Sequence, residues 1–326
     1  MSHPETTHFD VFNGDADGLC ALHQLRLAQP MASYLVTGVK RDIALLGRVR
    51  AQSGDSATVL DLPLGANQEA LQALLGQGVA IEYFDHHHAL QLPAHPLLHL
   101  THDPAPDVCT SVLVNRHLQG RFQAWAVVGA FGDNMPATAE GLAASLGLSA
   151  ANLDLLKTLG ECLNYNGYRD SEADLVIPPA SLYWLMEPYA DPLDFLENEK
   201  VCAELAWWRS KDMAQARNVT PTLATSRLTV IQLPDARWAR RVVGSYANLL
   251  ASRAPEKVCA ILVKNSRQTL TVSLRTPRGC AVSADQLVHK RGGDGRTRAA
   301  GINDLLPEEL TPFIQDLSEA LASNGK

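Results

Sequence analysis

Two aspartates, Asp15 and Asp17, lie one residue apart in a glycine-containing turn at residues 13–18. An apolar run at 9–12 precedes this turn and a helix-like run at 19–27 follows it, which is the pattern of a strand, a turn and a helix. Open α/β sheets keep their ligands at such turns. Two carboxylates placed there repel each other unless a cation joins them. One of them is well explained as a helix N-cap, so the turn alone leaves both interpretations open.

Carboxylates also occur where other predicted elements end. Asp61 ends a predicted strand at 57–60, and Asp133 follows Gly132 after a predicted helix at 122–130. Such positions are where an α/β architecture places ligand-binding residues. Hard carboxylate oxygens suit Mg²⁺ and Mn²⁺.

One Asp and three consecutive His, residues 85–88, end another predicted strand at 79–84. Consecutive residues of an extended segment point to opposite faces, so at most two of the four share one wall unless the chain turns. Imidazole is a common metal ligand, and a carboxylate usually fixes the tautomer of a coordinating His. Asp85 is therefore a candidate partner of His86. The alternative is a polar surface loop, which would require several strands to end in Asp by accident.

Strand-like and helix-like segments alternate through the first part of the chain, which predicts an α/β fold with a mostly parallel sheet flanked by helices. The predicted strands include 33–39, 57–60 and 79–84, and the helices between them are 43–52 and 68–75. Helical periodicity continues at 110–118, 122–130, 139–146 and 151–163, and a long helix at 193–217 is predicted to lead to the second part.

The second part combines strands and helices in a different order, with strands at 227–233, 257–264 and 269–275 and a helix at 238–253. A stretch at 290–301 then mixes four glycines with Arg and Lys side chains. Glycines let a backbone approach a phosphate closely while Arg binds its oxygens. The alternative is a flexible surface hairpin, since neither P-loop nor dinucleotide-binding spacing is present.

The charge is distributed unevenly along the 326 residues, whose net charge is −7. Residues 1–218 hold 13 basic and 26 acidic residues, whereas residues 219–326 hold 15 and 9. An acidic first part and a basic second part suit a cation site and an anion-binding surface. The overall acidity disfavours tight binding of long nucleic acid, which requires many phosphates to be neutralised.

The remaining composition indicates an ordinary globular protein of two domains, with 46% hydrophobic and 19% charged residues. No apolar run is long enough to span a bilayer, and residues 1–5 lack the features of a signal peptide. We therefore expect a cytoplasmic protein that does not bind membranes. The cysteines show no Cys-x-x-Cys pair, which predicts reduced packing residues at Cys20, Cys109, Cys162, Cys202, Cys259 and Cys280.

Taken in order, these motifs resemble those of a known family. Residues 14–18, Asp61, residues 85–87 and residues 132–133 are similar to the four motifs of the DHH phosphoesterase superfamily, and the segment 273–301 resembles the associated DHHA1 domain. The layout is most similar to the small phosphodiesterases of the NanoRNase-like and RecJ-related group. The resemblance implies a DHH metal-binding catalytic domain at 1–190, a helical linker at 191–218 and a smaller α/β DHHA1 substrate-binding domain at 219–326.

This resemblance also implies a centre of two metal ions, usually Mn²⁺, with Mg²⁺ or Co²⁺ as alternatives. Asp15 and Asp61 would bind the first ion, whereas Asp17, Asp61, His86 and Asp133 would bind the second, so that Asp61 bridges them. Two ions about 3.5–4 Å apart can share a hydroxide of lowered pKa that attacks phosphorus in line.

The other roles follow from the same resemblance. His87 matches the position expected to contact the scissile phosphate or to protonate the leaving group, so His87 and Asp61 are the predicted catalytic residues. His88 matches no family role and is expected to be a loop residue. The predicted substrate-binding residues are Arg275, Gly292, Gly293, Arg296 and Arg298.

Three residues depart from the family pattern. Val11 stands where many small-oligonucleotide members have a His, and Asn13 where RecJ-like members have an Asp. Asn13 and Asp85 are therefore expected as additional ligands or as partners of ligands. Without the family's His or Asp at positions 11 and 13, the first ion has one ligand fewer. Arg296 takes the place of the family's His in the glycine-rich motif, and this change implies either a preference for a more highly charged phosphate or altered catalysis.

The expected function is Mn-dependent hydrolysis of very short oligoribonucleotides or linear dinucleotides to nucleoside monophosphates. The expected partner is a short oligonucleotide or dinucleotide substrate. We do not expect binding of long double-stranded nucleic acid. A homodimer is compatible with the resemblance. One alternative is a RecJ-like single-strand exonuclease. Another is a catalytically weakened nucleotide-binding regulator, supported only by Val11 and Arg296. A pyrophosphatase is less expected, because the second domain resembles DHHA1.

Overall fold

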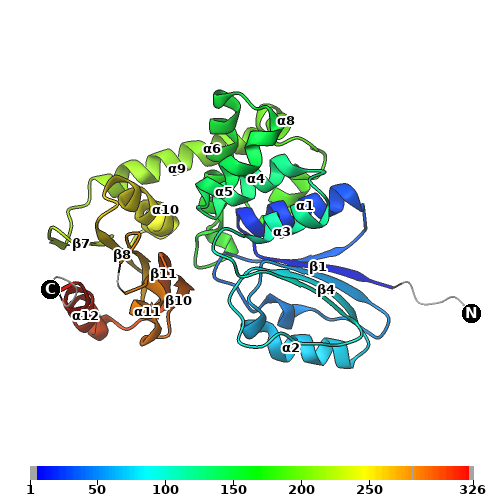
Figure 1. The fold of residues 1–326 in the computed structure, drawn as a ribbon, viewed down its shortest axis with the longest axis horizontal. Coiled ribbons are helices and arrows are strands. Elements are labelled where there is room, and N and C mark those ends of the chain that lie inside the picture. Colours follow the sequence, from blue (N-terminus) through cyan, green and yellow to red (C-terminus); the bar gives the residue numbers. More distant parts are fainter. Residues whose placement is uncertain (1–5, 281, 323–326) are drawn as a thin grey trace, which may run out of the picture. The chain divides into compact units, whose positions relative to one another are not determined.

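The computed structural model describes residues 6–280 and 282–322, and residues 1–5, which carry the expectation about a signal peptide, lie outside them. The chain forms two compact units, Met1–Ala206 and Trp207–Lys326 (Figure 1). The division falls inside helix α9 (Lys200–Arg217), within the segment 191–218 that the family resemblance implies as a linker. Among the described residues, no helix is both long and apolar enough to cross a membrane.

A five-stranded sheet in which every strand pair is parallel forms the centre of the first unit, as the alternating pattern predicts. Its strands lie in the order β2-β1-β3-β4-β5. Their bounds are His8–Phe12 for β1, Tyr34–Val36 for β2, Ser56–Leu60 for β3, Ala80–Asp85 for β4 and Leu98–His102 for β5. Because all strands run in one direction, the residues that follow them gather at one edge of the sheet.

Helices lie on both faces of this sheet (Figure 1), and apolar side chains form a layer on each face. Successive side chains of β1 point to opposite faces of the sheet. On one face, Phe9 and Val11 pack with α2 (Leu64–Gly76) and the 3₁₀ helix η1 (Leu45–Arg48). Phe12 packs on the other face with a larger group of helices. These are α1 (Ala16–Ala28), α3 (Thr110–His117), α4 (Gln123–Gly132), α5 (Pro136–Ala143), α6 (Ala150–Gly167), α7 (Pro179–Met186) and α8 (Pro192–Asn198).

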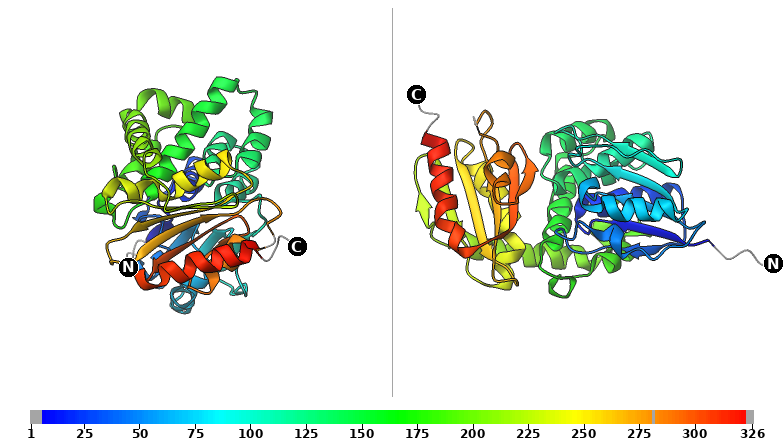
Figure 2. Two further views of the ribbon diagram at one scale, coloured as in Figure 1. Left: turned by 90° about the vertical axis from the view of Figure 1, so that its left-hand side faces the viewer. Right: turned by 90° about the horizontal axis from the view of Figure 1, so that it is seen from below.

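The second unit is built on a mixed six-stranded sheet in the order β10-β11-β9-β8-β7-β6, in which only β7 and β8 pair in parallel. Its strands are β6 (Leu223–Ala224), β7 (Leu228–Gln232), β8 (Val258–Lys264), β9 (Leu270–Arg275), β10 (Asp294–Arg296) and β11 (Ala299–Leu305). Helices α11 (Ala284–His289) and α12 (Leu310–Ala322) pack on one face, and α10 (Arg237–Arg253) covers the opposite face (Figure 2).

The structure differs from the sequence-based expectation in several segments. The helix predicted at 43–52 is only the single 3₁₀ turn η1. The long helix predicted at 193–217 is divided into α8 and α9, because Glu199 between them is extended, with φ −100° and ψ 116°. Strand β5, which extends the sheet beyond β4, was not predicted.

A buried ion pair joins β1 to α1 in the first unit. The Nε atom of Arg26 donates to Asp10 at 2.9 Å, a second guanidinium nitrogen contacts the other carboxylate oxygen, and Ser33 Oγ donates at 2.6 Å. Burial would raise the pKa of Asp10, but these hydrogen bonds and the charge of Arg26 hold it below its usual value. The pair therefore stabilises the fold above the unfolded-state pKa of Asp, about 3.9.

We expect Arg26→Ala to lower the free energy of unfolding by about 3–5 kcal/mol at pH 7, because it leaves a buried carboxylate without its cation. Urea denaturation measures this loss, which should shrink as the pH falls through the pKa of Asp10. Arg116→Ala is the matched control, since its pair with Asp103 is solvent-exposed and is worth about 0–1 kcal/mol. Equal losses for the two variants would contradict this assignment.

Candidate metal centre

The turn after β1 places Asp15 at the N-cap of α1. Asp15 Oδ1 accepts hydrogen bonds from the backbone N–H groups of Asp17 at 3.0 Å and Gly18 at 3.2 Å, which satisfies two otherwise unpaired donors of the helix. The N-cap interpretation of one aspartate is therefore correct for Asp15. Its second oxygen, Oδ2, contacts the ammonium group of Lys40.

Asp17 points from the first turn of α1 to the N-terminus of α3. Its two carboxylate oxygens accept hydrogen bonds from the backbone N–H of Thr110 at 2.7 Å and of Ser111 at 2.8 Å. These donors and the helix dipole stabilise a buried anion. Asp17 is 1% exposed, so its carboxylate is held in one orientation.

Asp61, directly after β3, has a left-handed backbone with φ 59°. Non-glycine residues rarely adopt this conformation, and such strain often occurs at functional sites. It turns the carboxylate to meet Thr110, whose hydroxyl donates at 3.2 Å, and His86, whose Nε2 lies 3.3 Å from Asp61 Oδ1. Burial and the negative charges of Asp17 and Asp15 raise the pKa of Asp61 well above its usual value.

His86 and His87 have different environments after β4. His86 is buried and its Nε2 lies 3.9 Å from Asp17 Oδ2, in addition to its contact with Asp61. His87 is more exposed, and Asp85 contacts its Nδ1 at 2.7 Å and accepts from its backbone N–H at 3.2 Å. The chain turns here, and Asp85 orients His87. The sequence pattern had suggested Asp85 as a partner of His86. His88 is exposed.

Asp133 caps the C-terminal end of α4. Gly132 before it allows α4 to approach α1 and α6, because a Cβ at this position would lie 2.2 Å from the Cβ of Ala16 and 2.9 Å from the carbonyl oxygen of Gly160. This close packing brings Asp133 to the turns of the sheet. The carboxylate oxygen of Asp133 lies 3.8 Å from the Nζ of Lys40.

Two groups of potential ligand atoms lie within 4.8 Å of one another in the described part of the chain: Asp61 with His86 and His87, and Asp17 with His86 and Asp133. Carboxylate oxygens combined with imidazole suit Mn²⁺ and similar divalent ions. Burial and the neighbouring charges of Asp17 and Asp15 both raise the pKa of Asp61, so a cation placed here would favour its charged form. By their chemistry, these residues fit a divalent metal ion.

Sequence analysis missed four residues that shape this centre. Thr110 donates to Asp17 and Asp61, and the ring Nε2 of His102 lies 2.7 Å from the carbonyl oxygen of His87. Lys40 contacts Asp15 and donates to Asn164 Oδ1 at 3.1 Å. Their segments carry no pattern of metal ligands, so only the fold reveals them.

The positive charge of Lys40 is secured by its surroundings. Burial would lower the pKa of its ammonium group, but the charges of Asp15 and Asp133, together with Tyr168, hold this pKa well above its usual value. Lys40 Nζ also lies 5.4 Å from the centre of the Tyr168 ring. These neighbours favour the charged form of Lys40, whose ammonium group contacts the acidic turn at Asp15.

The second unit places the predicted substrate-binding residues on and beside β9 and β10. Arg275 Nε donates to Asn248 Oδ1 at 2.7 Å, which fixes the guanidinium over α10. Gly292 and Gly293 precede β10, and Arg296 is partly buried at its end. Arg298 is exposed in the turn to β11.

The glycine-rich stretch thus forms a β-hairpin of β10 and β11. A hairpin is the structure that the sequence offered as the alternative to a phosphate-binding loop. Gly295 has φ 153°, and a Cβ there would lie 2.4 Å from the Cα of Ala300. Arg291 in the same stretch has a structural role, because it pairs with Asp316 at 2.9 Å and lies over Phe313.

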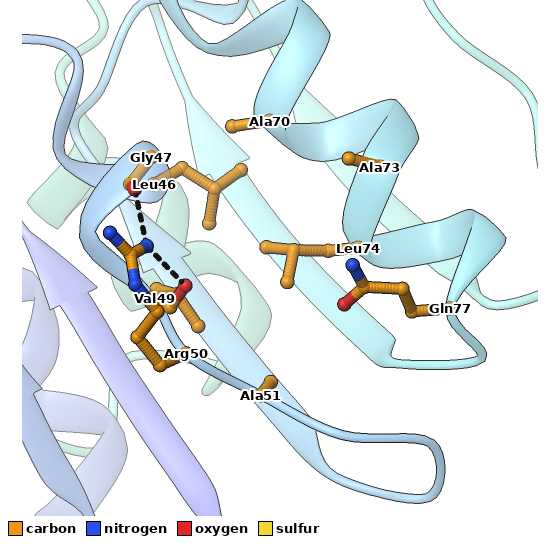
Figure 3. Close-up of a pocket in the computed structure, with 9 residues that line it drawn as sticks. All are labelled: Leu46, Gly47, Val49, Arg50, Ala51, Ala70, Ala73, Leu74 and Gln77. Atoms are coloured by element: carbon orange, nitrogen blue, oxygen red, sulfur yellow. Dashed lines mark hydrogen bonds between the residues drawn. The ribbon is translucent and has the colours of Figure 1, made fainter.

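A shallow pocket of the first unit lies elsewhere, between η1 and α2 (Figure 3). Arg50 folds back over its rim and donates to the carbonyl oxygens of Gly47 at 2.9 Å and Val49 at 3.1 Å. None of the acidic or histidine residues described above lines this pocket. It therefore adds nothing to the candidate metal centre.

Comparison with solved structures defines the class of fold. The chain aligns over 98% of its length with the manganese-bound exonuclease RecJ, covering 91% of that chain with a TM-score of 0.63 and 16% identity. The structure has the two-unit α/β fold of RecJ, and the fold implied by the resemblance to the DHH/DHHA1 superfamily is confirmed.

Two further structures share this fold at lower similarity. One is the pGpG-specific phosphodiesterase PggH from Vibrio cholerae, with a TM-score of 0.54, 14% identity and coverage of 98% of this chain and 100% of that one. The other is CDC45 from Entamoeba histolytica, with a TM-score of 0.53, 7% identity and coverage of 98% and 96%. No protein-family model matches the sequence, and no curated protein matches it either.

We expect Mn²⁺ to stabilise the protein against heat, by about 2.7 kcal/mol when its free concentration is 100 times the Kd. His86→Gln should weaken Mn²⁺ binding at least about tenfold, because it removes a ligand shared by both groups of donor atoms. His88→Gln is the matched control, being an exposed neighbour, and should bind like the wild type. Calorimetric titration measures both, and equal affinities would remove His86 from the centre.

Proposed function

We propose that the protein is a divalent-metal-dependent phosphodiesterase, with Mn²⁺ as its ion, that hydrolyses very short oligoribonucleotides or linear dinucleotides to nucleoside monophosphates. The single observation that carries this proposal is the pair of ligand groups that share the buried His86 at the edge of a parallel sheet: Asp17, His86 and Asp133 form one, and Asp61 with His86 and His87 forms the other. The fold adds support, because the alignment with the phosphodiesterase PggH covers nearly all of both chains.

Asp17, Asp61, His86 and Asp133 would hold the ion. When bound, a divalent ion lowers the pKa of a water molecule and stabilises the charge that develops on phosphorus. The protein's part is to fix the ligands, and it does so with backbone donors from α3 and with the hydroxyl of Thr110. These contacts hold the carboxylates in place, which lowers the cost of reorganisation during the reaction.

His87 is the candidate proton donor to the leaving oxygen. Its side chain is 36% exposed and therefore accessible to a substrate, whereas that of His86 is 3% exposed. Asp85, fully buried, holds Nδ1 of His87, which leaves Nε2 as the nitrogen that can carry a proton to the substrate. This arrangement of carboxylate and imidazole suits general acid catalysis.

Substrate recognition is assigned to the basic residues of the second unit. Arg275 is held by Asn248, and Arg296 and Arg298 lie at the end of the β10–β11 hairpin. Guanidinium groups bind phosphate through two parallel hydrogen bonds, which suits a terminal phosphate of a short substrate. The net charge of −7 for the whole chain favours a short substrate over a long strand.

A RecJ-like single-strand exonuclease is the second candidate, because the alignment with RecJ has the higher TM-score. The two candidates differ in how the rate depends on substrate length. We expect purified protein with Mn²⁺ to cleave 5′-phosphorylated dinucleotides faster than oligomers of about ten residues and to leave pyrophosphate intact, with EDTA abolishing cleavage. A rate that rises with length would favour the exonuclease, and intact dinucleotides beside another consumed substrate would refute the proposal.

We expect Asp61→Asn to reduce turnover of the dinucleotide by more than about 100-fold, since changes to partners of metal ligands alone cost roughly 10–100-fold. Asn is the suitable replacement, because it tolerates the left-handed backbone at this position. Asp154→Asn, on the exposed side of α6, is the control and should retain full turnover. Steady-state kinetics compares the two, and an active Asp61→Asn enzyme would exclude Asp61 from the reaction.

A further inference from the structure

We propose that the ammonium group of Lys40 occupies the place of one of the two metal ions that the family resemblance implies, so that the centre binds a single divalent ion. This inference rests on the proposed function, because it concerns how many ions the same acidic centre holds. It assigns to Lys40 the role of a built-in cation.

The contacts of Lys40 are those expected of a cation bound at the acidic turn. Its Nζ contacts Asp15 Oδ2, donates to Asn164 Oδ1 at 3.1 Å and lies 3.8 Å from Asp133 Oδ1. An ammonium group has three donors, and three oxygens surround it here. Asp15 and Asp133 are residues that the resemblance assigns to metal ions, so Lys40 competes directly for their oxygens.

Asp15 has little capacity left for a metal ion. One carboxylate oxygen accepts two backbone N–H groups as the N-cap of α1, and the other contacts Lys40. Consistent with this, Asp15 belongs to neither group of ligand atoms that lie within 4.8 Å of one another among the described residues. The first of the two implied ions would therefore lose a principal ligand.

Asn13 supports the lysine through a contact that an aspartate cannot make. Its side-chain N–H donates to the backbone carbonyl oxygen of Lys40 at 3.1 Å, and its Oδ1 accepts from the backbone N–H of Asp15 at 3.2 Å. A carboxylate at position 13 would have no donor for that carbonyl. The backbone N–H of Lys40 also donates to Gly167 at 2.9 Å, so the lysine is held at both of its peptide groups.

Val11 also removes a potential ligand of the first ion. Its side chain is fully buried in the apolar layer with η1 and α2, and so it supplies no ligand at the position where many relatives have a His. The two departures from the family pattern thus share one consequence: Val11 and Asn13 remove potential ligands of the first ion, and Asn13 also anchors the lysine that replaces it.

Electrostatics favours one added dication beside Lys40. A second dication within contact distance of the ammonium group would be strongly repelled in this largely buried place. The remaining ligands suffice for one ion, because Asp17, His86 and Asp133 offer atoms within 4.8 Å of one another. Asp61 adds a third carboxylate beside them, 3.3 Å from Nε2 of His86.

The test is the number of Mn²⁺ ions bound per chain of the metal-free full-length protein, measured by equilibrium dialysis and by the electron paramagnetic resonance spectrum at saturation. We expect one ion with the spectrum of an isolated Mn²⁺. Two ions with exchange coupling in the wild type would overturn the inference and leave the proposed function standing. No bound Mn²⁺ would instead refute the proposed function.

Variants test the role of the lysine itself. Asn13→Asp combined with Lys40→Ala should raise the number of bound ions from one to two, because it restores a carboxylate and removes the competing cation. Lys157→Ala, an exposed lysine on α6, is the matched control and should keep one ion. One ion in the double variant would overturn the proposed role of Lys40. The wild-type measurement decides the inference even if the double variant fails to fold.

Discussion

Mutual repulsion of buried carboxylates is the constraint on which the rest of the first unit depends. Asp15, Asp17, Asp61 and Asp133 are brought together where strands and helices end, and their charges must be compensated for the fold to be stable. The protein supplies part of this compensation itself, through the backbone donors of α1 and α3 and through Lys40. In the function we propose, a divalent cation supplies the remainder.

The acidic residues were predictable because their positions are local features of the sequence. Asp61 and His86 directly follow strands whose apolar composition marks them, and Asp15 and Asp17 lie in a recognisable turn. Lys40 was not predictable, because it lies in an irregular segment after β2 and is brought to the centre only by tertiary contacts with Asn13 and Gly167. Its residue type also gives no indication of a metal centre.

The elements of the fold were likewise predictable where they depend on the local sequence pattern, and were not predictable where they depend on tertiary contacts. The alternation of apolar strands and amphipathic helices predicted the parallel sheet, whereas residues 43–52 form only one 3₁₀ turn because the apolar pattern there serves packing against α2. Strand β5 has the sequence LHLTH, which is only a weak strand pattern, and it depends on pairing with β4. The contact of Asp85 with His87 was not foreseen, because the turn that brings these two side chains together is invisible in the sequence.

The most direct measurement of the central claim is anomalous X-ray scattering from crystals of the wild-type protein grown with Mn²⁺. We expect one manganese peak per chain, within coordination distance of Asp17, Asp61, His86 and Asp133, with the ammonium group of Lys40 still in contact with Asp15. A peak bound to Asp15 with Lys40 displaced would contradict the place given to the lysine. A chain with no peak at these carboxylates would contradict the metal centre as a whole.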